Sequence, residues 1–236
     1  MITEFFYPSR DELLAALVVE CSHILTAAVK ENGRASFLVS GGSTPKSLYQ
    51  RLSQQPLIWE RIDIALVDER WVSPDELGSN EFFLKESLLC NKALEANFIA
   101  MKNSATSAVL GYAECEETYK KLIRPFDLTI LGMGVDGHTA SLFPYSLGLN
   151  SALDVTQQAL CSVIEAKQSE VTGLLTERMT LSLSGLLQSK RLLLLITGEE
   201  KLAVYKKAVA QLDVYKTPVS AVLQQDKAPI NVYWSP

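Results

Sequence analysis

The stretch that decides the fold class spans residues 36–45 and reads SFLVSGGSTP. Its first four residues have the composition of a buried β-strand, and its two glycines allow a tight turn in which the backbone approaches a ligand closely. Ser43 or Thr44 can cap a following helix, and Pro45 suits the first turn of that helix. A strand that leads at once into a helix is the repeating unit of α/β proteins, so the rest of the chain should alternate in the same way.

The alternation continues in both directions from this stretch. Strands are predicted at 36–39, 62–67, 128–131, 160–164, 191–197 and 230–233, and helices at 10–30, 45–54, 79–90, 106–122, 177–188 and 199–212. Most of the strands are continuously apolar, as expected when helices cover both faces of a sheet. The sequence therefore predicts an α/β fold with an open, mostly parallel, doubly wound sheet, a Rossmann-like three-layer sandwich. Because no linker or repeat divides the chain, we expect a single domain over residues 1–236.

Composition limits the classes of function. The 236 residues include 22 Lys and Arg and 27 Asp and Glu, and the resulting net charge of −5 argues against a nucleic-acid partner while leaving small anions open. The four cysteines show no CxxC spacing, and two histidines are too few for a His-rich metal site, although carboxylates could still hold Mg²⁺ or Ca²⁺. The chain shows neither a signal-peptide layout nor an apolar run long enough to span a membrane. We expect a cytoplasmic protein with reduced thiols, as a monomer or small homo-oligomer.

Ligands of open α/β sheets bind in loops beyond the carboxyl ends of the strands. Four such loops carry chemically active residues, at 40–44, 68–70, 132–138 and 198–201. The first, followed by a helix N-terminus, suits a phosphate, although a capped turn without any ligand has the same sequence. In the second, Arg70 could bind a carboxylate or phosphate or stabilise an oxyanion, but for this loop taken alone a solvated charged turn is the simpler explanation.

The third loop contains a literal GxGxxG pattern at 132–137, directly after a strand. Pro144 leaves too little room for the long helix of a dinucleotide-binding crossover, so we do not expect a nicotinamide or flavin cofactor. His138 beside Asp136 could act as a general base near neutral pH. The alternative for His138 is a structural role, as a helix-start residue bonded to a backbone carbonyl.

Two further cations are candidate anion ligands. Lys201 falls in the first turn of a predicted helix, where a positive charge opposes the helix dipole and so suggests a nearby anion or acid. Arg178 lies at the start of another predicted helix and is a weaker candidate. A covalent mechanism has less support, because no GxSxG nucleophile elbow is present.

Five segments resemble the 6-phosphogluconolactonase family and follow the order of that family. They are LVSGGSTPKSLYQRL at 38–52, ALVDERWVSPDELGSN at 65–80, FDLTILGMGVDGHTASLFP at 126–144, ERMTLSLSGLL at 177–187 and LLITGEEK at 194–201. The closing PVSAVL and INVYW segments also look like the C-terminal end of these proteins. The resemblance therefore covers nearly the whole chain. It departs from the family at 169–176, where a Pro-rich turn is common, and at Gly78, where an acid is common.

The resemblance implies hydrolysis of 6-phospho-D-glucono-1,5-lactone, a sugar-phosphate lactone, without a metal or cofactor. It implies that His138 activates water, that Asp136 shapes or polarises its loop, and that Arg70 stabilises the oxyanion or holds the ligand. Asp68 counts as a catalytic candidate, with its role and that of Glu69 not yet separated. The implied phosphate ligands are Gly41, Gly42, Ser43, Thr44 and Lys201, with Arg178 as an additional candidate.

Two other functions remain as alternatives. A glucosamine-6-phosphate deaminase would share the phosphate loop and the Asp-Gly-His loop, and an acid such as Asp68 would be its base. A non-catalytic sugar-phosphate sensor is the second alternative. The sequence RWV at 70–72 and the ending HTASLFP at 138–144 look lactonase-like, and the retained His138 disfavours the sensor.

Overall fold

The computed structural model describes residues 1–236 and contains a seven-stranded, fully parallel sheet. In spatial order its strands are β1 (Ile2–Phe6), β10 (Ile230–Ser235), β9 (Leu192–Thr197), β6 (Leu128–Leu131), β2 (Ala35–Val39), β3 (Ile62–Leu66) and β5 (Asn97–Ile99). The chain enters this sheet at the edge strand β1, crosses to β2 near the centre, and from there winds outward, first through β3 to β5 and then through β6 to β9 and β10. This order confirms the predicted doubly wound sheet. The direction in which successive strands are added reverses between β2 and β6.

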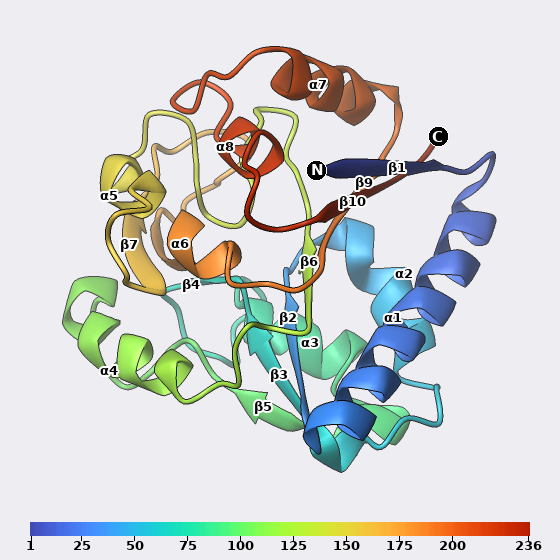
Figure 1. The fold of residues 1–236 in the computed structure, drawn as a ribbon. Coiled ribbons are helices and arrows are strands. Elements are labelled where there is room, and N and C mark those ends of the chain that lie inside the picture. Colours follow the sequence, from blue (N-terminus) through green and yellow to red (C-terminus); the bar gives the residue numbers. More distant parts are fainter.

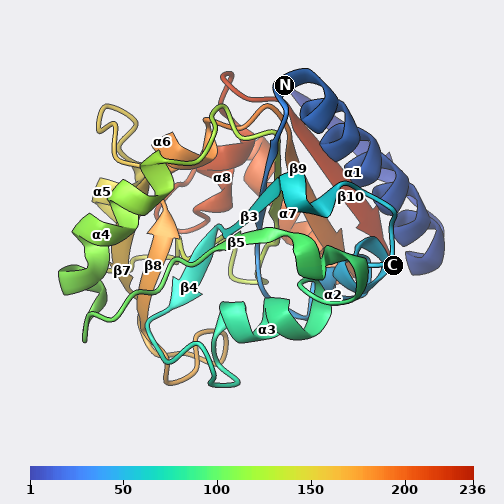
Figure 2. The same ribbon diagram turned by 90° about the horizontal axis from the view of Figure 1, so that it is seen from below.

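Helices flank the sheet on both sides. They are α1 (Arg10–Asn32), α2 (Ser43–Leu52), α3 (Asn80–Ser87), α4 (Ala108–Lys120), α5 (Leu149–Leu153), α6 (Leu183–Leu186), α7 (Glu199–Ala210) and α8 (Val219–Leu223), with 3₁₀ turns at Trp59–Arg61 and Asn91–Glu95. Figure 1 shows α1 and α2 on one side of the sheet and α4, α5 and α6 on the other. The view from below separates the same layers (Figure 2).

A second sheet of three antiparallel strands lies on the side of α4. It is formed by β4 (Asp68–Arg70), β8 (Glu177–Leu181) and β7 (Cys161–Glu165), in that order. The strand predicted at 160–164 therefore belongs to this sheet and not to the parallel one. The helix predicted at 177–188 is wrong over its first half, because these residues fill the gap between β4 and β7 and pair with both. Only the short helix α6 remains of that prediction.

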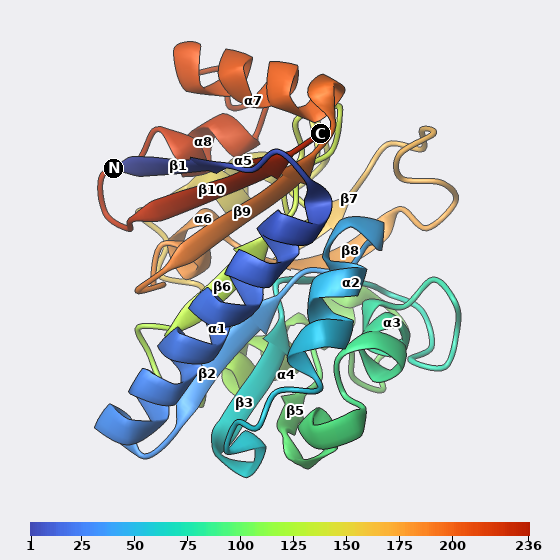
Figure 3. The same cartoon turned by 90° about the vertical axis from the view of Figure 1, so that its right-hand side faces the viewer.

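Helix α1 shows how the sequence places one such layer. Ser9 caps its first turn by accepting a hydrogen bond from the Glu12 backbone N–H, and Gly33 ends it with a left-handed φ of 76°. Its buried stripe includes Leu13, Leu17, Cys21 and Leu25, and these residues belong to a contiguous core of 62 buried residues. By length and composition alone α1 could cross a membrane, a property that it shares with core helices of soluble proteins. Figure 3 shows it lying across β6 and β2.

Candidate active site

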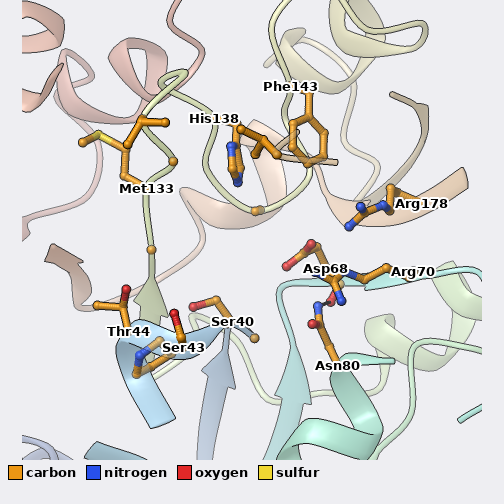
Figure 4. A pocket seen from close by; sticks show the side chains of 18 of the residues that line it. Ser40, Ser43, Thr44, Asp68, Arg70, Asn80, Met133, His138, Phe143 and Arg178 are labelled. Atoms are coloured by element: carbon orange, nitrogen blue, oxygen red, sulfur yellow. Dashed lines mark hydrogen bonds between the residues drawn. The ribbon is translucent and has the colours of Figure 1, made fainter. Parts of the chain in front are cut away.

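A cavity of about 310 Å³ opens where the carboxyl ends of the central strands meet. It lies beside the reversal between β2 and β6, the position at which open α/β sheets bind ligands. Nine of the predicted site residues line it: Gly41, Gly42, Ser43, Thr44, Asp68, Arg70, His138, Arg178 and Lys201. The topology therefore brings the four predicted loops together. Figure 4 shows His138 and Phe143 on one side, Ser40, Ser43 and Thr44 opposite, and Asp68, Arg70 and Arg178 at the remaining side.

The first loop ends in the N-terminus of helix α2. The N-cap of this helix is Gly42 and not Ser43 or Thr44, both of which lie inside the first turn. Gly42 has φ 101°, a backbone conformation that only glycine adopts without strain. Because no side chain caps this helix, its first N–H groups are free to bind an anion.

Lys201 reaches this helix end from the first turn of α7. Its Nζ lies 3.5 Å from Oγ1 of Thr44, so the ammonium group and the α2 N-terminus border the same part of the cavity. Partial burial lowers the pKa of Lys201, and the nearby Glu200 only partly opposes this effect. A half-buried lysine with no salt bridge, beside a free helix N-terminus, is well placed for a phosphate.

Strand β4 separates the roles of its two acids. Glu69 is fully buried and accepts four hydrogen bonds, from the backbone N–H groups of Arg70, Asn80 and Glu81 at 2.7–2.8 Å and from the Ser79 hydroxyl at 3.0 Å. Burial raises the pKa of Glu69, and these hydrogen bonds oppose the increase. Glu69 thus fastens β4 to the start of α3, and it does not line the cavity.

Asp68 and Arg70 flank Glu69 and both face the cavity. The Asp68 carboxylate accepts a hydrogen bond of 2.6 Å from the Ser141 hydroxyl. The Arg70 guanidinium donates to the Gly78 carbonyl, while its Nε is buried and has no partner. Gly78 stands where the family commonly has an acid. A Cβ at this position would lie 2.4 Å from a Leu175 methyl carbon, so the glycine allows the Leu175 side chain to pack closely against this loop.

His138 is paired with Asp136 in the third loop. The ring Nδ1 lies 2.5 Å from Oδ1 of Asp136, and the same oxygen accepts the His138 backbone N–H at 3.1 Å. Burial by itself would raise the pKa of Asp136. The hydrogen bond from His138 and the charge of the His138 ring outweigh this effect, so the pKa of Asp136 is lowered. An ionised carboxylate at Nδ1 keeps the proton there and leaves Nε2 as a free base. Asp136 is the one predicted site residue that does not line the cavity, and it contacts the ring at Nδ1.

Two glycines make this pairing possible. A Cβ at Gly134 would lie 2.2 Å from Nδ1 of His138 and 2.5 Å from Oδ1 of Asp136, and Gly137 has a left-handed φ of 80°. No helix follows the loop before Pro144, so the GxGxxG pattern here packs the histidine and does not start a dinucleotide crossover. His138 is therefore not at a helix start.

Arg178 lies in strand β8 and not at a helix start as predicted. Its side chain is buried, donates from Nε to the Leu175 carbonyl at 2.7 Å, and lies over the Phe143 ring at 5.4 Å. It is the cross-strand neighbour of Arg70 in the β4–β8 ladder. Burial, with Arg70 as the next cause, lowers the pKa of Arg178 to about 10, opposed by Asp68 and Glu69. A buried and a half-buried cation side by side on one cavity wall favour an anionic ligand.

Sequence reasoning missed several residues of the cavity wall. Asn80, Phe143 and Val171 line it, and Ser141 orients Asp68 from outside it. The Phe143 ring packs 4.4 Å from the His138 ring. Asn80 follows a recognisable capping residue, but its orientation toward the cavity depends on Glu69 and could not be read from spacing.

Outside this cavity, few titratable side chains lie close to one another. No group of three or more His, Cys, Asp or Glu side chains is arranged to hold a metal ion. All four cysteines are free, and the sulfurs of Cys115 and Cys161 lie 3.7 Å apart in the core. His23 is exposed on α1 and does not line the cavity.

The chain is similar to known proteins over nearly its whole length. The family model described as glucosamine-6-phosphate isomerases/6-phosphogluconolactonase matches residues 8–234. The chain belongs to this family. A 6-phosphogluconolactonase of Rhizobium meliloti is 37% identical over 224 residues, which cover 95% of this chain and 94% of the relative. Another from Pseudomonas aeruginosa is 36% identical over 228 residues, covering 97% and 92%.

A solved structure gives the same family relationship in three dimensions. The crystal structure of a 6-phosphogluconolactonase from Shewanella baltica matches the whole of this chain and 98% of its own, with a TM-score of 0.93 and 40% sequence identity. The fold and the order of the loops around the cavity are thus those of a glucosamine-6-phosphate isomerase/6-phosphogluconolactonase family member.

Proposed function

We propose that this chain is an enzyme that hydrolyses 6-phospho-D-glucono-1,5-lactone to 6-phospho-D-gluconate, a step of the oxidative pentose phosphate pathway. One observation carries the proposal: the His138–Asp136 pair presents a free imidazole nitrogen to a cavity whose other walls carry anion ligands. Family membership and the names of the relatives support the same reaction. We place the enzyme in the cytoplasm, with a small-molecule substrate and without a nucleic-acid or membrane partner.

His138 acts as the general base. Its Nε2 takes a proton from a water molecule while the water oxygen attacks the lactone carbonyl carbon, and the Asp136 carboxylate stabilises the resulting imidazolium. The carbonyl oxygen becomes an oxyanion, which the Arg70 guanidinium stabilises electrostatically. The bond between the carbonyl carbon and the ring oxygen then breaks, and the imidazolium returns its proton to that oxygen. Because a lactone is an ester whose acyl carbon accepts water directly, this sequence requires neither a metal nor a redox cofactor.

The phosphate of the substrate binds at the α2 N-terminus. The N–H groups that follow Gly41 and Gly42, the Ser43 and Thr44 hydroxyls and the Lys201 ammonium all border that end of the cavity. These groups hold the substrate at a point remote from the reacting carbon, so the binding energy of the phosphate serves to position the lactone against His138. Arg178 adds positive charge on the wall next to Arg70.

One comparison tests the function directly. A single preparation is assayed for hydrolysis of 6-phosphogluconolactone, corrected for spontaneous opening, and for deamination of glucosamine 6-phosphate, with and without EDTA. We expect lactone hydrolysis that resists EDTA and no deamination. Deamination alone would assign the deaminase alternative, and binding of 6-phosphogluconate without either activity would assign the sensor.

A further inference from the structure

Ser40, Asp68 and Asn80 form one part of the cavity lining, which we call the floor. The floor offers hydrogen-bonding groups that no protein atom uses. Ser40 is only 5% exposed and its Oγ has no hydrogen-bond partner, although it lines the cavity between β2 and Gly132. Nε of Arg70, on the adjoining wall, is likewise buried without a partner. Unpaired buried polar atoms are rare because they cost stability, so two of them on one cavity point to groups that a ligand supplies.

Asp68 adds unused acceptors to the same floor. The residue is 6% exposed, and the Ser141 hydroxyl is the one donor to its carboxylate. Two carboxylate oxygens can accept about four hydrogen bonds, so most of this capacity remains free toward the cavity. Ser141 is itself held by its backbone N–H, which donates to the Thr180 hydroxyl at 3.2 Å, so the orientation of Asp68 is set by the fold.

Asn80 completes the floor. Its Nδ2 donates to the Asp68 backbone carbonyl at 2.8 Å, and its backbone N–H is fixed by Glu69. A Cβ at Gly41 would lie 2.0 Å from Oδ1 of Asn80, so the carboxamide lies directly against the phosphate loop. Its Oδ1 has no donor in the protein, which makes it a further acceptor beside Asp68. Figure 4 shows Asn80 next to Asp68 and Arg70, with Ser40 beside them and His138 across the cavity.

These groups fit hydroxyls better than they fit a phosphate. The Asp68 carboxylate would repel an anion, whereas a sugar hydroxyl can donate to a carboxylate or an amide oxygen and accept from a serine hydroxyl. The proposed phosphate site and the proposed base occupy other walls, so the ring hydroxyls of the substrate are the part left for the floor. We propose that Ser40, Asp68 and Asn80 bind the ring hydroxyls and set the sugar specificity, with Asp68 binding a hydroxyl and not transferring a proton.

The inference rests on the proposed function. It is tested by combining variants of the floor residues with substrate analogues that each lack one hydroxyl. Wild type, Asp68→Asn, Ser40→Ala and the exposed-loop control Asp75→Asn are assayed with 6-phosphogluconolactone and its 2-deoxy, 3-deoxy and 4-deoxy analogues. A hydroxyl bound to a charged acceptor contributes about a tenfold to hundredfold factor in kcat/KM. We expect Asp68→Asn to lose that factor on the parent lactone, largely through KM, and to lose little on the analogue that lacks the hydroxyl bound to Asp68.

The outcomes separate the possible roles. Equal losses on all four lactones, mainly in kcat, would mean that Asp68 is a base or a structural residue and would overturn the proposal. If Asp68→Asn does not fold, Ser40→Ala is decisive, since its Oγ has no protein partner to lose. Calorimetric titration with 6-phosphogluconate and its deoxy analogues gives the same comparison without turnover. If the wild type does not hydrolyse the lactone but binds 6-phosphogluconate more tightly than its deoxy analogues, the proposed function is refuted and the hydroxyl-binding role of the floor stands. If the wild type is active but the effects of each variant and of each missing hydroxyl simply add, the hydroxyl-binding role alone is refuted.

Discussion

Nδ1 of His138 lies 2.5 Å from Oδ1 of Asp136, two residues earlier in the same loop. A pair this close in sequence needs an unusually tight backbone, which the loop closes with hydrogen bonds from Gly134 N–H to the His138 carbonyl and from Gly137 N–H to the Gly134 carbonyl, each 3.0 Å long. The carboxylate therefore sets both the tautomer and the direction of the ring. The proposed chemistry depends on that tautomer, because Nδ1 must carry the proton if Nε2 is to accept one.

Asp136→Asn should lower kcat with little change in KM. An asparagine can turn its N–H₂ group toward Nδ1 and so favour protonation at Nε2, which removes the base. A carboxylate-to-amide change behind a catalytic histidine of the serine-protease type lowers the rate by about 10⁴-fold, and we expect a loss between roughly tenfold and that value. Steady-state kinetics decide the matter, and an unchanged kcat would exclude the proposed orienting role.

His138→Ala should remove most of the lactone hydrolysis above the spontaneous rate. Loss of a general base costs roughly a hundredfold or more. His23→Ala, a change at the exposed histidine of α1, serves as the matched control and should retain full activity. A His138→Ala protein that hydrolyses the lactone at the parental rate would refute the assigned base.

Gly134→Ala should separate catalysis from binding. The new methyl group would overlap both partners of the His138–Asp136 pair, at 2.2 and 2.5 Å, and would displace the ring. A misplacement of about 1 Å can cost on the order of a hundredfold in rate, while the phosphate ligands on the opposite wall are untouched. We expect a large fall in kcat and nearly normal binding of 6-phosphogluconate. At Gly132, where the nearest atom is 4.0 Å from the added methyl, the same substitution should cost less.

Much of the fold could be predicted because the parallel strands are continuously apolar and the intervening helices carry a clear apolar stripe. The short elements could not. Strand β4 consists of three charged residues, and β5 has only three residues, so neither shows a pattern of its own. The strand β8 could not be predicted because it lies between β7, which precedes it in the chain, and β4, which comes from a distant part of the sequence. Pairing over such distances overrides local propensity.

The site was predictable for a related reason. Loops that follow parallel strands must meet at one edge of the sheet, so residues as distant as Thr44 and Lys201 could be assigned to one cavity in advance. Ser141 and Asn80 could not be found in this way, since each matters through a contact made by folding: Ser141 through Asp68, and Asn80 through Gly41. The separation of Asp68 from Glu69 likewise needed the structure, because alternate residues of β4 point in opposite directions.

Lys201→Ala should weaken recognition of the phosphate specifically. The ammonium group borders the α2 N-terminus, and loss of a charged hydrogen bond to phosphate should raise KM about tenfold or more. The same variant should be unimpaired with unphosphorylated glucono-1,5-lactone, a poorer substrate that lacks the interaction. Lys206→Ala, at an exposed position of the same helix, provides the control. A KM for the phosphorylated lactone equal to that of wild type would remove Lys201 from the phosphate site.

The lowered pKa of Arg178 predicts an alkaline limit to ligand binding. Burial and the neighbouring Arg70 bring this pKa to about 10, within reach of titration, whereas an ordinary arginine stays protonated. A bound anion favours the protonated form and raises the pKa again. Affinity for 6-phosphogluconate should therefore be constant below about pH 9 and fall as the pH rises through 10, by at most tenfold per unit for this group. Calorimetric titration between pH 7 and 11 measures the decline, with Lys201→Ala as the background so that lysine titration does not contribute. Arg178→Gln in that background should bind more weakly at neutral pH and lose the step near pH 10, and a step that persists in this double variant would assign the titration to another group.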